Sequence, residues 1–254
     1  MSAEIVRERV MLPLDGQTPM GAYLARPSAP GPYAAVIIGM ELFGVTSHIR
    51  NVADRLAGKG YLVLAPDFYH RMESGAELKY DQAGRDRGFE LLHQVSRADA
   101  LQDVEAAMHF LQRHPGFRGR VGFLGFSVGG HIGYLAATQL DLAACALFYA
   151  GWLPTCEIEL SQPNPTLTLT PGITRTGARL IYFVGGKDFL VPSAQREQIV
   201  RALEEAQVRH EMVVYPNAQH GFFCDERDTF DSASRDDAWK RTLELFNSEL
   251  NPPG

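Results

Sequence analysis

The ten residues Val121-Gly-Phe-Leu-Gly-Phe-Ser-Val-Gly-Gly130 combine an apolar strand, a glycine-bounded turn and the start of a helix. Residues 121–126 are apolar enough for a strand buried on both faces of a sheet, and 128–138 have a helical pattern. Between them, Ser127 has a glycine two residues away on each side, the G-x-S-x-G pattern of a nucleophile elbow. Small flanking residues let neighbouring backbones approach while the turn projects the hydroxyl outward. We therefore predict Ser127 as a nucleophile; the alternative is an inert serine in a glycine-rich turn.

Short apolar strands alternate with helical patterns along the rest of the chain. The expected strands are 34–39, 61–65, 143–149, 180–184 and 211–215, and the expected helices are 48–59, 98–113, 193–206 and 232–250. Upstream, 5–11 and 21–26 alternate like strands on either side of the turn signal Asp15-Gly16. This order predicts an α/β fold, with a mostly parallel sheet of about eight strands, helices on both faces and an antiparallel pair at about 4–26.

The composition is that of an ordinary globular protein and narrows the functional classes. The chain has 254 residues, 45% hydrophobic and 21% charged, which suits one large domain over 1–254. Its net charge of −6 argues against a nucleic-acid partner. The scattered cysteines Cys145, Cys156 and Cys224 fit neither a disulfide framework nor a zinc cage. The charged N-terminus lacks a secretion signal and the longest apolar run, 142–153, is too short to cross a bilayer, so we expect a cytoplasmic protein without a membrane partner.

Two segments interrupt the alternation of strands and helices. Residues 69–88 are rich in charge, and 154–177 are rich in threonine and proline. Long connections at strand ends often serve as lids or specificity loops, although a surface excursion without a role is equally compatible with this composition. We regard both segments as possible lid or specificity loops.

A serine nucleophile needs a base and an orienting acid. Asp188 follows the expected strand 180–184 and His220 follows 211–215, so both lie at the sheet edge where α/β folds place their sites. We predict that His220 takes the proton from Ser127 and that Asp188 orients the imidazole. His70 is a rival base because it also follows a strand, and Asp67 and Asp225 are alternative acids.

The loop after 34–39, Met40-Glu41-Leu42-Phe43-Gly44, occupies the position that usually supplies an oxyanion donor. We assign the two donors to the backbone amides of Leu42 and Val128. Glu41 would then lie close to Ser127, where it could accept a hydrogen bond or repel a second negative charge. A salt bridge from Glu41 to an arginine, with a purely structural role, is the alternative.

Five motifs in the same order resemble the dienelactone hydrolase family of α/β-hydrolases, over roughly 33–250. They are Glu41-Leu-Phe-Gly44, Gly60-Tyr-Leu-Val-Leu-Ala-Pro-Asp-Phe-Tyr69, Val121-Gly-Phe-Leu-Gly-Phe-Ser-Val-Gly-Gly130, Gly185-Gly-Lys-Asp188 and His220-Gly-Phe222. The resemblance implies an α/β-hydrolase fold and hydrolysis of a lactone or ester through Ser127, Asp188 and His220. It also implies a supporting role for Glu41 and oxyanion amides at Leu42 and Val128.

The chain departs from the well-known family members at two positions. Those proteins carry a cysteine nucleophile where this chain has Ser127, and a hydroxyl needs its base at the moment of attack. They also bind the substrate carboxylate with arginines, one of them at the position that Cys224 occupies here. The remaining candidates for substrate contact are Arg85, Arg87, Arg227, Phe43 and Phe222.

The expected function is cofactor-independent hydrolysis of a small carboxylic ester or lactone through an acyl-enzyme. The sequence has no metal-ligand cluster, no G-x-G-x-x-G and no P-loop, so neither a metal nor a cofactor is implied. Two other interpretations stay open: an acylpeptide or amide hydrolase with the same chemistry, and a non-catalytic ligand-binding relative of the fold. None of the motifs encodes the oligomeric state.

Overall fold

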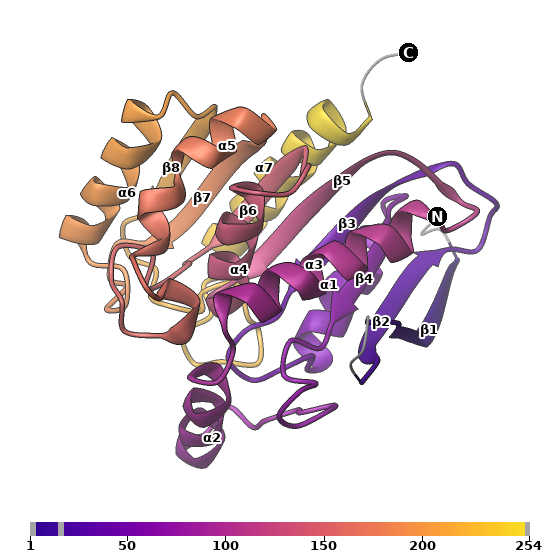
Figure 1. Cartoon of the computed structure of the whole chain (residues 1–254), viewed down its shortest axis with the longest axis horizontal. Coiled ribbons are helices and arrows are strands. Elements are labelled where there is room, and N and C mark those ends of the chain that lie inside the picture. Colours follow the sequence, from indigo (N-terminus) through magenta and orange to yellow (C-terminus); the bar gives the residue numbers. More distant parts are fainter. Residues whose placement is uncertain (1–3, 15–17, 252–254) are drawn as a thin grey trace.

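The computed structural model describes residues 4–14 and 18–251, so the predicted Asp15-Gly16 turn lies outside the described residues. Its centre is one eight-stranded sheet with the order β1-β2-β4-β3-β5-β6-β7-β8 (Figure 1). β2 pairs antiparallel with both β1 and β4, and all other pairs are parallel. The strands are β1 (Ile5–Leu12), β2 (Met20–Pro27), β3 (Tyr33–Gly39), β4 (Leu62–Pro66), β5 (Phe117–Phe126), β6 (Ala144–Phe148), β7 (Arg179–Gly185) and β8 (His210–Tyr215). The predicted fold class is confirmed.

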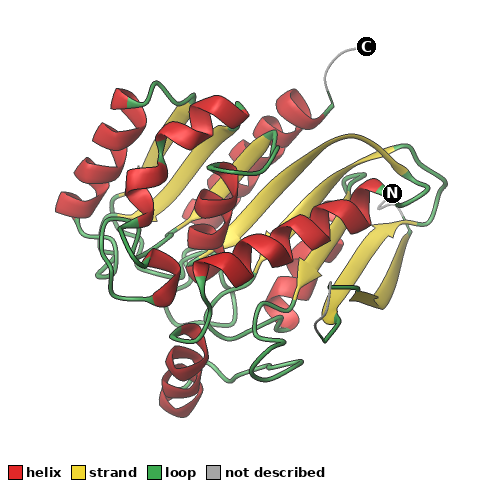
Figure 2. Ribbon diagram, viewed as in Figure 1, coloured by secondary structure: helices red, strands yellow, loops and turns green. Residues whose placement is uncertain are grey.

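β4 and β6 are buried along their whole length because helices cover both faces of the sheet (Figure 2). α3 (Arg97–Gln112) and α4 (Val128–Ala137) pack against each other and on the central strands. α1 (Ser47–Ala57) and α7 (Ser232–Leu250) lie behind the sheet in Figure 1, where Arg55 sits 4.2 Å from the centre of the Trp239 ring. α6 (Ser193–Glu205) follows β7. These helices begin and end close to the predicted positions.

A helix that the sequence pattern does not predict begins within the segment 69–88 and extends beyond it. α2 (Gln82–Leu92) begins where the Asp81 side chain accepts a hydrogen bond from the Gly84 amide at 2.8 Å. Its composition is polar and includes two glycines, which are poor helix formers, so it resembles a loop in the sequence. Gly88 is needed for packing, because a Cβ there would lie 2.6 Å from Leu42 Cγ. α2 lies apart from the two helix layers, beyond the ends of the strands (Figure 1).

The segment 154–177 also forms short helices instead of an irregular loop. It contains two 3₁₀ turns, η1 (Glu159–Ser161) and η2 (Thr166–Leu169), followed by α5 (Pro171–Thr176). Proline at the first helical position and Gly177 in a left-handed conformation at the end fix the limits of α5. No helix in the described part of the chain is both long enough and apolar enough to span a bilayer.

Candidate active site

Ser127 occupies a strained turn between β5 and α4. Its backbone has φ 52° and ψ −112°, outside the regions that a side-chain-bearing residue normally adopts. Close packing of its backbone against the end of β3 holds the turn in place. The Gly129 amide donates to the Met40 carbonyl at 3.0 Å, and a Cβ on Gly39 would lie 2.7 Å from Gly129 O. Glycines are therefore required here, because any side chain would separate the turn from the end of β3.

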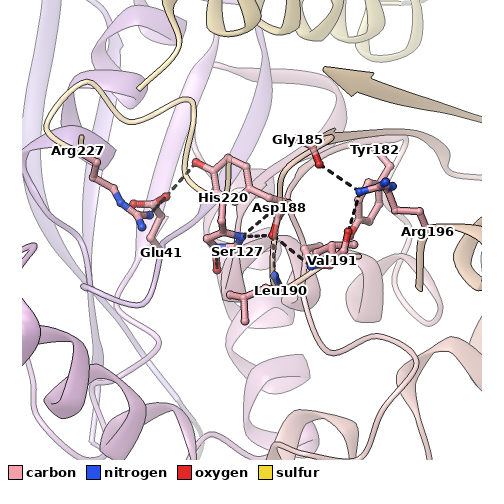
Figure 3. Close-up of polar contacts among 12 residues, drawn as sticks. Glu41, Ser127, Tyr182, Gly185, Asp188, Leu190, Val191, Arg196, His220 and Arg227 are labelled. Carbon is pink, nitrogen blue, oxygen red and sulfur yellow. Dashed lines mark hydrogen bonds and ion pairs between the residues drawn. The ribbon is translucent and has the colours of Figure 1, made fainter. Parts of the chain in front are cut away.

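Three polar side chains form a continuous hydrogen-bonded series at the carboxyl ends of β5, β7 and β8 (Figure 3). Ser127 Oγ lies 3.0 Å from His220 Nε2, and His220 Nδ1 lies 3.0 Å from Asp188 Oδ2. A carboxylate only accepts, so Nδ1 carries the proton and Nε2 accepts from the serine hydroxyl. All three residues are buried, with 3 to 5% of their surface exposed. The sequence-predicted acid, base and nucleophile are thus brought into contact.

The loop after β7 holds the Asp188 carboxylate in this orientation. Oδ1 accepts hydrogen bonds from the amides of Leu190 at 2.9 Å and Val191 at 3.2 Å. Arg196, in the first turn of α6, closes the loop by donating to the carbonyls of Gly185 at 3.2 Å and Val191 at 3.0 Å (Figure 3). Sequence reasoning missed Arg196, since an arginine in a surface helix carries no motif.

The rival acids and base are occupied elsewhere. His70 Nε2 lies 3.3 Å from the buried Asp103 carboxylate. Asp67 accepts hydrogen bonds from two backbone amides and lines a separate cavity of about 200 Å³ beside β2. Asp225 lies 3.5 Å from His48 Nδ1. None of the three candidates is in contact with the predicted nucleophile.

The two predicted oxyanion amides lie at the ends of β3 and β5. Val128 is the first residue of α4, where backbone N–H groups lack an acceptor within the helix. Leu42 lies in the loop after β3, and its carbonyl accepts a hydrogen bond from the buried Tyr69 hydroxyl at 3.0 Å. No backbone acceptor within the described chain is in hydrogen-bonding contact with the Leu42 amide. Both amides are thus positioned at the edge of the sheet that carries Ser127.

Glu41 is 1% exposed and pairs with the partly buried Arg227 beside the nucleophile (Figure 3). Its Oε1 lies 3.5 Å from an Arg227 nitrogen and accepts from the Tyr149 hydroxyl at 2.9 Å. Burial alone would lower the pKa of Arg227, but the neighbouring Glu41 carboxylate raises it overall. The arginine salt bridge, one of the two roles considered for Glu41, is therefore present. Tyr149 has no sequence signal for this contact.

A cavity of about 180 Å³ opens beside Ser127. Among the residues predicted to contact substrate, Phe43, Arg85 and Arg227 line this cavity. Arg87 and Phe222 do not line this cavity, and Arg87 instead pairs with Glu73 and Glu90 on the exposed side of α2. The remaining lining residues are Glu41, Leu42, Ser127, His220 and the unpredicted Phe89, Trp152, Phe189 and Leu190.

Phe222 does not reach the cavity because it is fully buried behind it. Its ring lies 5.4 Å from that of Tyr149, and the preceding Gly221 has φ 80°, which turns the chain inward after His220. The segment 154–177 likewise contributes no lining residue and packs behind Trp152. No group of three potential metal-ligating side chains occurs in residues 4–14 and 18–251.

The strand order and the turn that carries Ser127 define the class of the protein as an α/β-hydrolase fold. A family model described as "Dienelactone hydrolase family" matches residues 20–250. The chain belongs to this family of hydrolases, as its motifs suggested.

Individual relatives agree with this assignment. A Synechocystis sp. protein named "Putative carboxymethylenebutenolidase" is 38% identical over 251 residues, covering 98% of this chain and 100% of the relative. An Escherichia coli (strain K12) protein of the same name is 32% identical, covering 95% and 87%. The crystal structure of a "Putative Dienelactone Hydrolase" from Klebsiella pneumoniae superimposes with a TM-score of 0.86 at 33% identity, covering 96% of this chain and 99% of that chain.

Proposed function

We propose that the protein is a serine hydrolase that cleaves a small carboxylic ester or lactone through an acyl-enzyme. The observation that carries the proposal is the series of hydrogen bonds from Ser127 through His220 to Asp188, next to a cavity. A strained turn that aims a hydroxyl at a buried imidazole has a cost in stability, and such strain is concentrated at functional sites.

The chemistry follows from the positions of these groups. Ser127 Oγ attacks the carbonyl carbon while its proton passes to His220 Nε2, and Asp188 stabilises the imidazolium. The amides of Leu42 and Val128 donate to the oxyanion of the tetrahedral intermediate. The intermediate collapses, the alkoxide leaves with the proton from His220, and water then attacks the acyl-serine with His220 as base. In a lactone, the leaving alkoxide remains part of the acyl group.

The three cysteines support serine as the nucleophile. Cys145 is fully buried, and burial raises the pKa of its thiol well above the usual range. Cys224 is also buried, and burial together with the nearby Glu41 carboxylate raises its pKa to about 12. Cys156 is exposed and lies outside the set of cavity residues. A thiolate mechanism would require a thiol of lowered pKa at the cavity.

The cavity favours a small substrate with both apolar and anionic parts. The cavity, of about 180 Å³, is lined by Phe43, Phe89, Trp152 and Phe189 and by two arginines, Arg85 and Arg227, of which Arg227 is paired with the Glu41 carboxylate. Aromatic rings suit a planar apolar group, and guanidinium groups suit a carboxylate. A butenolide lactone, as denoted by the names of the Synechocystis and E. coli relatives, is of this kind.

The proposal is tested with Ser127→Ala and His220→Ala in assays of a p-nitrophenyl ester and a butenolide lactone. Each variant should lose at least about 10³-fold in kcat while its circular dichroism and melting temperature stay close to those of the parent. Activity of the parent on amides in preference to esters and lactones would favour an amide hydrolase. A folded parent that turns over none of the three substrate classes would favour a ligand-binding protein.

A further inference from the structure

The chain segment from Tyr149 to Trp152, directly after β6, has an unusual conformation and carries Trp152 to the cavity. Tyr149 has φ 40° and Trp152 has φ 60°, so two side-chain-bearing residues are in the left-handed region within four positions. Only specific contacts from the surroundings can hold such a segment in place. Trp152 is the residue of this segment that is 9% exposed and lines the cavity with Ser127.

Three consecutive carbonyl groups of this segment each accept a hydrogen bond from a different buried side chain. The Tyr182 hydroxyl donates to the Ala150 carbonyl. His131 Nδ1 lies 2.8 Å from the Gly151 carbonyl, and the Ser161 hydroxyl donates to the Trp152 carbonyl at 2.9 Å. The backbone that carries the Trp152 ring is therefore fixed from β7, from α4 and from η1.

His131 is the contact that joins this segment to the helix of the nucleophile. It lies one turn after Ser127 in α4 and is completely buried. Burial lowers the pKa of its imidazole to about 4, so the ring is neutral near pH 7. Because a carbonyl only accepts, Nδ1 carries the proton, and Nε2 accepts from the Thr166 hydroxyl at 2.8 Å. Arg97 in turn donates to Thr166 and to the carbonyls of 160 and 164.

We propose that His131 is a positioning residue that fixes Trp152 as a wall of the cavity. The cavity then selects substrates by the size of the group that faces Trp152. The Trp152 ring meets the Phe89 ring of α2 edge-on, with centroids 6.3 Å apart. A shift of the Gly151 peptide would move Trp152 relative to this ring and change the width of the cavity. The kinetic part of this proposal rests on the proposed hydrolase function, and its spectroscopic part does not.

Two substitutions separate the two hydrogen bonds of His131. In His131→Asn the side-chain amide nitrogen can occupy the place of Nδ1, which preserves the donor to the Gly151 carbonyl. In His131→Gln the amide instead reaches the place of Nε2, and the Gly151 carbonyl loses its donor. The proposal predicts that His131→Asn resembles the parent and that His131→Gln does not, although both substitutions remove the same ring from the core.

The position of Trp152 can be observed directly, since the chain has only two tryptophans, Trp152 and Trp239. In a Trp239→Phe background the fluorescence reports Trp152 alone. We expect His131→Gln to shift the emission to longer wavelength and to raise the acrylamide quenching constant at least twofold, with His131→Asn within about 20% of the parent. Equal quenching in the two variants would overturn the proposal, whether or not the protein hydrolyses any ester.

Kinetics supply the second readout. For a bulky ester such as p-nitrophenyl benzoate, His131→Gln should raise KM by about 3- to 10-fold relative to His131→Asn, the range expected for one lost hydrogen bond, with a smaller change in kcat. Equal KM values in the two variants would contradict the proposal. If His131→Gln does not fold, Ser161→Ala removes the donor to the Trp152 carbonyl and should increase quenching in the same direction; unchanged quenching there would overturn it.

Discussion

The two sides of the cavity are built by different means. On one side, the elbow (Gly39, Gly125, Ser127 and Gly129) is held by backbone atoms in direct contact, with no side chain between β3 and α4. On the other side, the cavity is lined by an aromatic wall (Phe89, Trp152 and Phe189). The backbone that carries Trp152 is held there by hydrogen bonds from the side chains of His131 and Ser161, which lie in distant segments. Direct backbone packing allows only one geometry of the turn, whereas a side-chain contact can be changed by a single substitution without altering the others. The elbow therefore suits the invariant chemistry, and the aromatic wall suits the choice of substrate.

The largest expected effect comes from the hydrogen bonds that serve the elbow. Asp188→Asn should lower kcat by about 10⁴-fold, because an amide can stabilise the wrong histidine tautomer and cannot stabilise the imidazolium. Asp225→Asn is the matched control, since that carboxylate is 57% exposed and lies beside His48, away from the cavity residues. Steady-state kinetics of both variants on one ester test this expectation. A loss below about tenfold in Asp188→Asn would show that the acid does not act through His220.

A methyl group inserted into the elbow should be the next most damaging change. A Cβ on Gly129 would fall closer than van der Waals contact to the backbone of Gly39, so Gly129→Ala should cost about 3 kcal/mol or prevent folding. Gly21→Ala is the control, because a Cβ there meets nothing within 4 Å. It should change stability by about 0.5 kcal/mol or less. Urea unfolding of both variants measures the difference, and similar free energies would refute the backbone-contact account.

Changes at the mouth of the cavity should have smaller effects confined to KM. Arg85→Ala should raise KM for the anionic p-nitrophenyl hemisuccinate about tenfold, with little change for the neutral p-nitrophenyl butyrate. Arg87→Ala should leave both KM values within about twofold, since Arg87 is bound to Glu73 and Glu90 away from the cavity. Equal changes in KM for the two substitutions would mean that lining the cavity does not determine whether an arginine contacts the substrate.

Much of the sheet could be predicted from the sequence because buried parallel strands have a local signature, namely short apolar runs bounded by glycine, proline or aspartate. The same holds for Ser127, Asp188 and His220, each of which lies within five residues of the end of such a run. The aromatic wall could not be predicted. Trp152 acquires its place through His131, and the contact depends on folding rather than on spacing in the sequence.

Two features of the cavity depend on single glycines. Phe222 is a candidate for substrate contact in the sequence, but it lies in the core after the left-handed Gly221 and does not line the cavity. α2 was read as a loop because it is polar, although it contributes Arg85 and Phe89 to the cavity through the close approach of Gly88 to Leu42. In both cases a single glycine determines where neighbouring side chains lie, and composition does not reveal which glycine does so.

The central claim is that Ser127 is the nucleophile and is activated by His220. The most direct test is to treat the parent protein with a fluorophosphonate and to locate the adduct by peptide mass spectrometry. We predict one adduct, on the peptide that contains Ser127, which is absent in Ser127→Ala and forms at least about 10³-fold more slowly in His220→Ala. An adduct on any other residue, or no adduct on the folded parent protein, would contradict the account.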